Sequence, residues 1–233
     1  MDIVLVPGFW LDASSWDAVT PQLVEAGHRI HPLTLPGLES RDASRAGIGL
    51  ADHIDFVAGK VDSLDGDVVL VGHSGGGAVI HGVADRRPDR IARNIYVDSG
   101  PPAEGQAVND ELPADGDEIP LPPWDEFMDM DLVDLDDQLR AEFIARAVPL
   151  PRRVATDGIT LTDERRLDVP VTVIANEFPS QILRDAIAAG EPWVGELGRV
   201  RDVEYVDLPT GHWPQFTKPA ELGAAIVEAL RDR

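Results

Sequence analysis

The pentapeptide Gly72-His73-Ser74-Gly75-Gly76 is the segment of this chain whose residue types and spacing point most directly to chemistry. It fits the pattern G-x-S-x-G, in which a serine occupies a sharp turn between a strand and a helix. Such a turn crowds the backbone, so glycines flank the serine because they lack a Cβ. The pattern predicts that the hydroxyl of Ser74 projects as a nucleophile above the edge of a sheet.

A serine hydroxyl needs a base to take its proton, and His212 is the best placed of the six histidines. It lies in the segment Pro209-Thr-Gly-His-Trp-Pro-Gln-Phe216, after the last predicted strand and before the last predicted helix. A loop in that position meets the carboxyl edge of a parallel sheet, where α/β proteins bind their ligands. The other histidines flank or fall within predicted elements, and we assign them structural or solvent roles.

Six short β-branched runs predict the strands that must position these residues. Each run is followed within two residues by Gly, Pro, Asp or Asn, which favours a turn at its end. The predicted strands are Ile3–Val6, Arg29–Thr34, Val68–Val71, Asn94–Val97, Val171–Ile174 and Val203–Val206.

Segments with helical spacing of apolar residues alternate with these runs. They are Ser15–Ala26, Ala51–Ser63, Gly76–Arg87, Gln181–Ala189 and Pro219–Arg231. The alternation predicts an α/β fold, a doubly wound and mostly parallel six-stranded sheet with helices on both faces.

The alternation breaks between about Gly100 and Asp168, where no strand is predicted and an amphipathic stretch covers about Asp137–Val148. We therefore predict a core of residues 1–99 and 169–233, with residues 100–168 inserted as a cap. From 104 to 142 the insertion has 14 acidic residues and a single basic one, Arg140. Its acidic run does not match a calcium-binding EF-hand loop, since Asp134 stands where that loop needs glycine. We predict no metal.

The composition excludes several classes of function. With 20 Lys and Arg against 42 Asp and Glu, the net charge is −22, which repels nucleic acids and anionic lipid surfaces. The absence of cysteine excludes disulfides, thiolate nucleophiles and iron–sulfur clusters. The first apolar run, Ile3–Val6, is too short for a signal peptide, and no run approaches a membrane span. We predict a cytoplasmic, soluble protein; a homodimer is compatible with the sequence.

These features resemble the α/β-hydrolase superfamily over nearly the whole chain. The order Ser74, acid, His212 matches that family. The first predicted strand already carries the loop Val6-Pro7-Gly8-Phe9-Trp10, where relatives usually have His-Gly. The sheet therefore resembles the shortened version that lacks the family's two leading strands, and the insertion corresponds to the family's cap.

The resemblance also implies an oxyanion hole made by the backbone N–H groups of Phe9 and Gly75. We expect Trp10, Trp124 and Trp213 to line the substrate pocket. The apolar side chains of the cap could equally serve to anchor it to the body of the protein.

The acidic residue that orients His212 is where the sequence departs from the family pattern. Relatives commonly place Asp shortly after the strand that follows the cap, but Val173–Ser180 offers only Glu177. An alternative family arrangement puts the acid at the end of the preceding strand, where Asp98 stands. We favour Asp98, because Glu177 follows its strand almost at once and has little slack to reach His212. Asp98 could instead cap its own loop, so both assignments stay open.

The resemblance implies a serine hydrolase that cleaves an ester, thioester or lactone through an acyl-enzyme and needs no cofactor. A lyase of the same fold, or a binding protein with a residual triad, are the alternatives, since fold alone does not fix chemistry. The acidic cap favours neutral or cationic small-molecule acyl substrates over anionic ones, unless Arg152 or Arg153 compensates.

Overall fold

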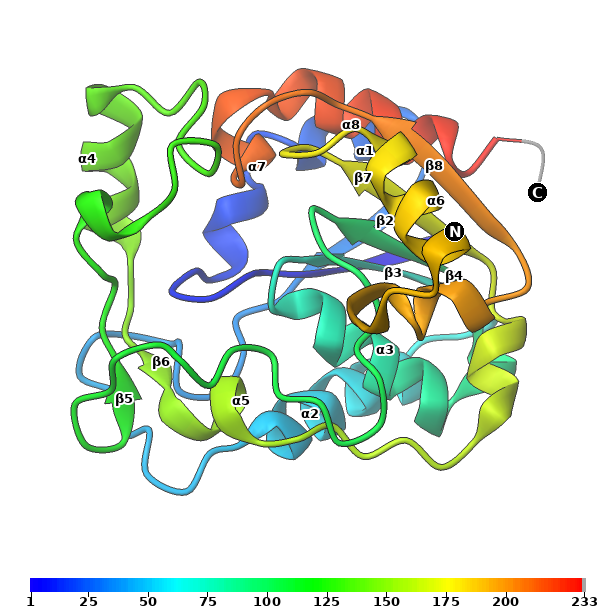
Figure 1. The fold of residues 1–233 in the computed structure, drawn as a ribbon, viewed down its shortest axis with the longest axis horizontal. Coiled ribbons are helices and arrows are strands. Elements are labelled where there is room, and N and C mark those ends of the chain that lie inside the picture. The colour runs from blue at the N-terminus through cyan, green and yellow to red at the C-terminus, as the bar shows by residue number, and fades with distance from the viewer. Residues whose placement is uncertain (232–233) are drawn as a thin grey trace.

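A sheet of six parallel strands forms the centre of the computed structural model, which describes residues 1–231 (Figure 1). The strands lie in the order β2-β1-β3-β4-β7-β8. Their bounds are Asp2–Val6 (β1), Arg29–Pro32 (β2), Val68–His73 (β3), Ile91–Val97 (β4), Val171–Ala175 (β7) and Val203–Asp207 (β8). All six predicted strands and the predicted fold class are confirmed. Every residue of β1 and β3 is buried, as expected for strands that are covered on both faces.

Helices connect the strands and cover both faces of the sheet (Figure 1). They are α1 (Thr20–Glu25), α2 (Leu50–Asp62), α3 (Gly76–Arg86), α4 (Asp137–Arg146), α5 (Arg152–Thr156), α6 (Ser180–Ala189), α7 (Pro214–Thr217) and α8 (Pro219–Glu228). The helix predicted from Ser15 begins only at Thr20, because Pro21 occupies its first turn and residues 13–16 form a separate 3₁₀ turn. Over residues 1–231, every helix is too short or too polar to cross a bilayer.

The hydrophobic core has two layers, one on each face of the sheet. On one face, α2 and α3 pack Ile54, Val57 and Val83 against Val4 and Leu70. On the other face, α1 and α8 contribute Leu23, Leu222 and Ile226, which pack with Leu5 and Val69. The same strands supply both layers through alternate residues, so the sheet edge that carries the candidate site is held from both sides.

Residues 100–168 lie between β4 and β7 in the chain. They contain α4, α5 and two strands of two residues each, Glu118–Ile119 (β5) and Leu150–Pro151 (β6), which pair antiparallel. Our prediction of no strand in this segment was wrong, because a two-residue pairing leaves no periodic pattern. Arg41 and Arg45 fasten the segment by donating to the carbonyls of Ala147 and Pro149.

The turn from β3 into α3 brings backbone segments so close that side chains would collide there. A Cβ on Gly72 would stand 2.6 Å from the carbonyl oxygen of Gly76, and a Cβ on Gly76 would stand 2.7 Å from those of Val6 and Pro7. Gly59, inside α2, has open space around the same position. The glycines of the motif therefore serve close packing of the turn.

We expect Gly72→Ala to lower the free energy of unfolding by about 1–3 kcal/mol, since the added methyl forces the backbone apart. Gly59→Ala is the control and should raise it by about 0.5–1 kcal/mol, because alanine favours a helix. Urea denaturation followed by circular dichroism measures both. Equal effects of the two variants would contradict the steric account of the turn.

Candidate active site

Ser74 lies immediately after β3, in a backbone conformation that few side chains adopt. Its φ is 50°, in the left-handed region. Its N–H still donates to the carbonyl of Val97 on the neighbouring strand at 3.1 Å, so the residue is tied to the sheet while the chain turns away. This conformation lifts the side chain above the carboxyl edge of the sheet, where the motif predicted it.

Asp98 repeats this arrangement one strand further along. It follows β4 directly, has a φ of 45°, and its N–H donates to the carbonyl of Ile174 at 2.9 Å. Aspartate tolerates the left-handed region better than most residues. Because β3 and β4 are adjacent in the sheet, the side chains of Ser74 and Asp98 project from the same edge.

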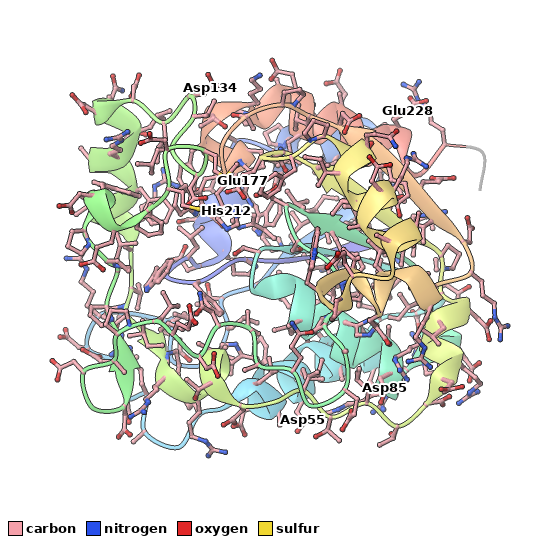
Figure 2. All side chains as sticks on the ribbon, in the orientation of Figure 1. Asp55, Asp85, Asp134, Glu177, His212 and Glu228 are labelled. Atoms are coloured by element: carbon pink, nitrogen blue, oxygen red, sulfur yellow. The ribbon has the colours of Figure 1, made fainter. Side chains whose placement is uncertain are left out.

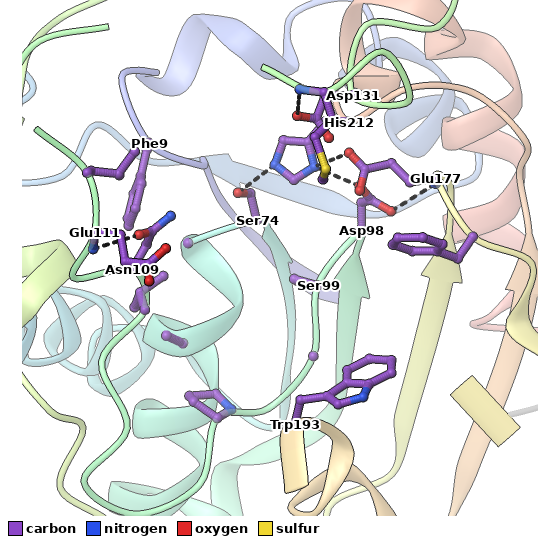
Figure 3. A pocket seen from close by; sticks show the side chains of 18 of the residues that line it. Phe9, Ser74, Asp98, Ser99, Asn109, Glu111, Asp131, Glu177, Trp193 and His212 are labelled. Carbon is purple, nitrogen blue, oxygen red and sulfur yellow. Dashed lines mark hydrogen bonds and ion pairs between the residues drawn. The ribbon is translucent and has the colours of Figure 1, made fainter. Parts of the chain in front are cut away.

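The imidazole of His212 lies between these two side chains (Figure 3). Its Nε2 stands 2.8 Å from the Ser74 Oγ, and its Nδ1 stands 2.7 Å from Oδ2 of Asp98. Since a carboxylate only accepts, the Nδ1 carries the proton, which leaves Nε2 of the neutral ring to accept from the serine hydroxyl. Residues 138 positions apart in the sequence thus meet at hydrogen-bonding distance.

Glu177 also reaches His212, although we expected it to have little slack to do so. Its Oε1 stands 3.2 Å from the Nδ1, and Figures 2 and 3 show its side chain beside the imidazole. The turn after β7 is held close to the histidine loop because the Asn176 amide donates to the carbonyl of Leu208. Asp98 is the shorter contact, and its other oxygen accepts the N–H groups of Asn176 and Glu177 at 3.1 and 3.2 Å.

The two carboxylates dominate the electrostatics of the imidazole. Burial alone would lower the pKa of His212, but the hydrogen bonds and charges of Asp98 and Glu177 raise the pKa to about 10. Burial raises the pKa of Glu177, and the Asp98 carboxylate nearby adds to this against the opposing contact with His212. The arrangement stabilises a positive charge on the ring, which a proton-shuttling base must carry transiently.

Three backbone contacts hold the histidine loop, and none of them was predicted from sequence. The side chain of His73 bonds through Nε2 to the carbonyl of His212 at 2.7 Å. Burial lowers the pKa of His73 to about 3, with the nearby His212 adding to the effect, so its ring is neutral and donates from Nε2. The N–H groups of Gly211 and His212 donate to the carbonyls of Val133 and Asp131 in the insertion. The motif residue His73 was the available signal, because it directly precedes Ser74.

Phe9 and Gly75 are the residues whose backbone N–H groups we expect to form an oxyanion hole. Both residues line the cavity around the serine hydroxyl, and a Cβ on Gly75 would collide with the Phe9 ring. Within residues 1–231, neither N–H donates to another group of the protein. Two unoccupied donors at the start of α3 and in the loop after β1 suit a negatively charged oxygen.

One set of side chains within the described residues has the composition of a metal site. Ligand-type atoms of Asp98, Glu177 and His212 lie within 4.8 Å of one another. The Nδ1 of His212 is already hydrogen-bonded to Asp98, and a metal bound there would compete for this nitrogen. The geometry therefore suits an oriented base better than a resident cation.

A cavity of about 820 Å³ opens above these residues and contains Ser74 and His212 in its wall. Trp10 and Trp213, which we expect to line the substrate pocket, are in the wall of this cavity. Trp124 lies outside the lining, so the prediction for this residue was wrong. Its ring packs edge-on against Phe143 and Trp213, with centroids 5.4 and 5.7 Å apart, and thereby anchors the insertion to the histidine loop.

Apart from His212, the ionisable side chains in the wall of this cavity are all acidic. Besides Asp98 and Glu177, the lining includes Glu111, Glu126 and Asp131. Among the residues that the structure describes, the lining has no Lys or Arg, and Arg152 and Arg153 lie outside it. The insertion supplies three of these carboxylates, so its negative charge reaches the cavity itself.

Comparisons with known proteins agree with this fold. A carbendazim-hydrolysing esterase from Nocardioides sp. (strain SG-4G) is 38% identical over 115 residues, 48% of this chain and 47% of that protein. A pyrethroid hydrolase from Sphingobium wenxiniae is 34% identical over 97 residues, 41% of this chain and 35% of that protein. The chain thus matches less than half the length of either relative.

Among solved structures, an extracellular α/β-hydrolase from a Paenibacillus species superimposes with a TM-score of 0.79 over 100% of both chains, at 24% identity. That protein is described as sharing structural and functional homology with tobacco salicylic acid binding protein 2. The sequence profile of the alpha/beta hydrolase family matches residues 3–225. With this match over nearly its whole length, the chain belongs to the alpha/beta hydrolase family.

Proposed function

We propose that this protein is a serine hydrolase that cleaves carboxylic esters through an acyl-enzyme. The observation that supports the proposal most is the imidazole of His212, with Nε2 at 2.8 Å from the Ser74 Oγ and Nδ1 at 2.7 Å from Asp98. The names of the matched relatives, an esterase and a hydrolase, point in the same direction.

In this mechanism the Ser74 Oγ attacks the ester carbonyl while Nε2 of His212 takes the hydroxyl proton. Asp98 holds the ring in the correct tautomer and stabilises its positive charge. The N–H groups of Phe9 and Gly75 donate to the oxyanion, each worth about 3–4 kcal/mol in the transition state. His212 then protonates the departing alcohol, and water activated by the same ring releases the acid and regenerates Ser74.

We further propose that residues 100–168 act as the cap of the site and influence substrate choice. Phe127 and Met128 of this segment line the cavity, and the carbonyls of Asp131 and Val133 hold the histidine loop. Cleavage of thioesters or lactones, a homodimer, the exclusion of nucleic acid partners and a cytoplasmic location stay predictions from the sequence.

Ser74→Ala and His212→Ala should each lower kcat for a neutral ester by about 10³-fold or more, because each removes a partner of the attack. Hydrolysis of 4-nitrophenyl butanoate measures this, and a fluorophosphonate probe should label the wild type at Ser74 and neither variant. A folded wild-type protein that neither hydrolyses esters nor takes the label would favour the binding-protein alternative.

Substitution of Asp98 and of Glu177 should have different effects on kcat and on its pH dependence. Asp98→Asn should lower kcat by about 10³–10⁴-fold through loss of the correct tautomer, whereas Glu177→Gln should leave it within about tenfold. Since Glu177 raises the pKa of His212, its removal lowers that pKa and moves the acidic limb of kcat/KM to lower pH. The opposite ranking of the two variants would assign the orienting role to Glu177.

The acidic lining should discriminate against anionic substrates. At low salt we expect kcat/KM for methyl pentanoate to exceed that for monomethyl succinate by about tenfold or more, because the lining carboxylates repel the second group. The ratio should shrink in high salt, which screens the repulsion, and in Glu126→Gln, which removes one lining charge. Equal rates for the two esters at low salt would contradict the electrostatic argument.

A further inference from the structure

An exposed tryptophan, Trp193, stands at the edge of the cavity. Trp193 is 54% exposed and Phe178 is 38% exposed, although both line the cavity that contains Ser74. Figure 3 shows the Trp193 indole below Asp98 and Ser99. Large apolar side chains that stay exposed at the rim of a cavity are typical of surfaces that a ligand covers.

The neighbours of Trp193 make this part of the wall apolar. Val194 and Leu197 belong to the same short segment and are buried, and Leu183 of α6 and Val173 of β7 complete the lining. Trp193 and Val194 lie in a 3₁₀ turn, Pro192–Val194, that follows α6. The cavity therefore has an apolar wall on this side. The carboxylates that the insertion contributes lie elsewhere in the lining.

Glu196 lies in the middle of this segment and points away from the cavity into a buried network. It is 3% exposed. Its Oε1 accepts from the Nε and Nη2 of Arg166 at 2.9 and 2.8 Å and lies 3.3 Å from the Nε2 of His81. Its Oε2 accepts from Arg199 at 2.8 Å.

Other buried groups extend this network to the body of the protein. Arg166 also contacts Asp85 at 3.3 Å, and Asp85 accepts the N–H groups of Thr162 and Asp163. His81 and Asp85 lie on α3, the helix that follows Ser74, and Figure 2 shows Asp85 far from His212. Burial raises the pKa of Glu196, but the contacts with His81 and Arg166 outweigh it and lower the pKa to about 2.

A buried carboxylate persists only where several partners compensate its lost hydration. None of these groups touches the candidate triad, so the reaction does not account for them. The network is joined through Glu196 to the segment that carries Trp193. It holds that segment on its buried side, while the Trp193 ring stays exposed. An aromatic surface that is rigid before the ligand arrives loses little entropy on binding.

We propose that residues 192–197 form a preorganised apolar subsite for the hydrophobic arm of a neutral ester, with Trp193 determining specificity and Glu196 acting as a positioning residue. This rests on the ester hydrolysis proposed above and names its substrate class. The substrate is the occupant because the subsite is continuous with the cavity that contains Ser74.

Trp193→Ala tests the subsite, with Phe56→Ala as the matched control. Phe56 is 44% exposed on α2 and lies outside the cavity lining. Two ester series are compared, methyl esters of lengthening acids and acetates of lengthening alcohols, because either arm can occupy the wall. In the series whose lengthening arm contacts the wall, Trp193→Ala should lower kcat/KM for the eight-carbon ester by about tenfold, mainly by raising KM. It should change kcat/KM for the shortest ester by no more than about twofold. Phe56→Ala should change neither.

Glu196→Gln tests the positioning role, with Asp85→Asn as a control within the same network. Both variants should lower the melting temperature, because each leaves Arg166 less compensated. Only Glu196→Gln should reduce the preference for long over short esters. Asp85 contacts Arg166 and the backbone of residues 162 and 163, whereas Glu196 belongs to the segment of the apolar wall itself. An unchanged preference in both variants would make Glu196 merely structural.

Binding separates a failure of the subsite from a failure of the proposed hydrolysis. Calorimetry with Ser74→Ala measures binding of the eight-carbon ester from the series that responds, methyl octanoate or octyl acetate. Its binding should become about tenfold weaker once Trp193→Ala is added. This result would support the subsite even if the wild type hydrolysed no ester. If Trp193→Ala weakened the binding of short and long esters equally, the subsite would be overturned. It would also be overturned if Trp193→Ala changed a dimer to a monomer in sedimentation and left the preference for long esters unchanged, because the surface would then be an interface between copies of the chain.

Discussion

The site depends on one constraint, that a single imidazole must lie within hydrogen-bonding distance of two side chains that start from different strands. Parallel strands meet this requirement because β3 and β4 end at the same edge and are neighbours in the sheet. Ser74 and Asp98 leave these ends with φ values of 50° and 45°, which turn both side chains over that edge. Such conformations cost of order 1–3 kcal/mol each and persist only where the surroundings impose them. Here the surroundings are the ladder hydrogen bonds of each residue to the next strand.

The imidazole of His212 comes from a loop, and this loop is held by hydrogen bonds to its backbone. His73 from the motif and two carbonyls of the insertion bond to residues 211 and 212. The aromatic packing of Trp124 and Phe143 on Trp213 fixes the same loop from the side of the insertion. A change in the insertion would therefore alter the position of the base as well as the shape of the cavity. The acidic residues of the insertion and the apolar residues around Trp193 line the same cavity. One part of its wall is therefore acidic and another part is apolar.

Much of this arrangement follows from the sequence, for identifiable reasons. Buried parallel strands are rich in β-branched residues, so all six could be located, and the glycines of the motif mark a turn that is too crowded for a Cβ. His212 could be selected because its loop follows the last strand. The choice between Asp98 and Glu177 could not be made in this way, because β4 and β7 are adjacent and both residues reach the same nitrogen. Trp124 was misplaced because the direction of a side chain in a loop depends on tertiary packing, which leaves no local pattern. The network around Glu196 joins residues from 81 to 199 and has no sequence signature either.

The most direct test is a crystal structure of the protein after reaction with a neutral phosphonate ester, which mimics the tetrahedral intermediate. We predict a bond from phosphorus to the Ser74 Oγ, a phosphoryl oxygen about 2.7–3.1 Å from the nitrogens of both Phe9 and Gly75, and an imidazole still bonded to Asp98. An adduct on another residue, or a phosphoryl oxygen directed away from both nitrogens, would contradict it.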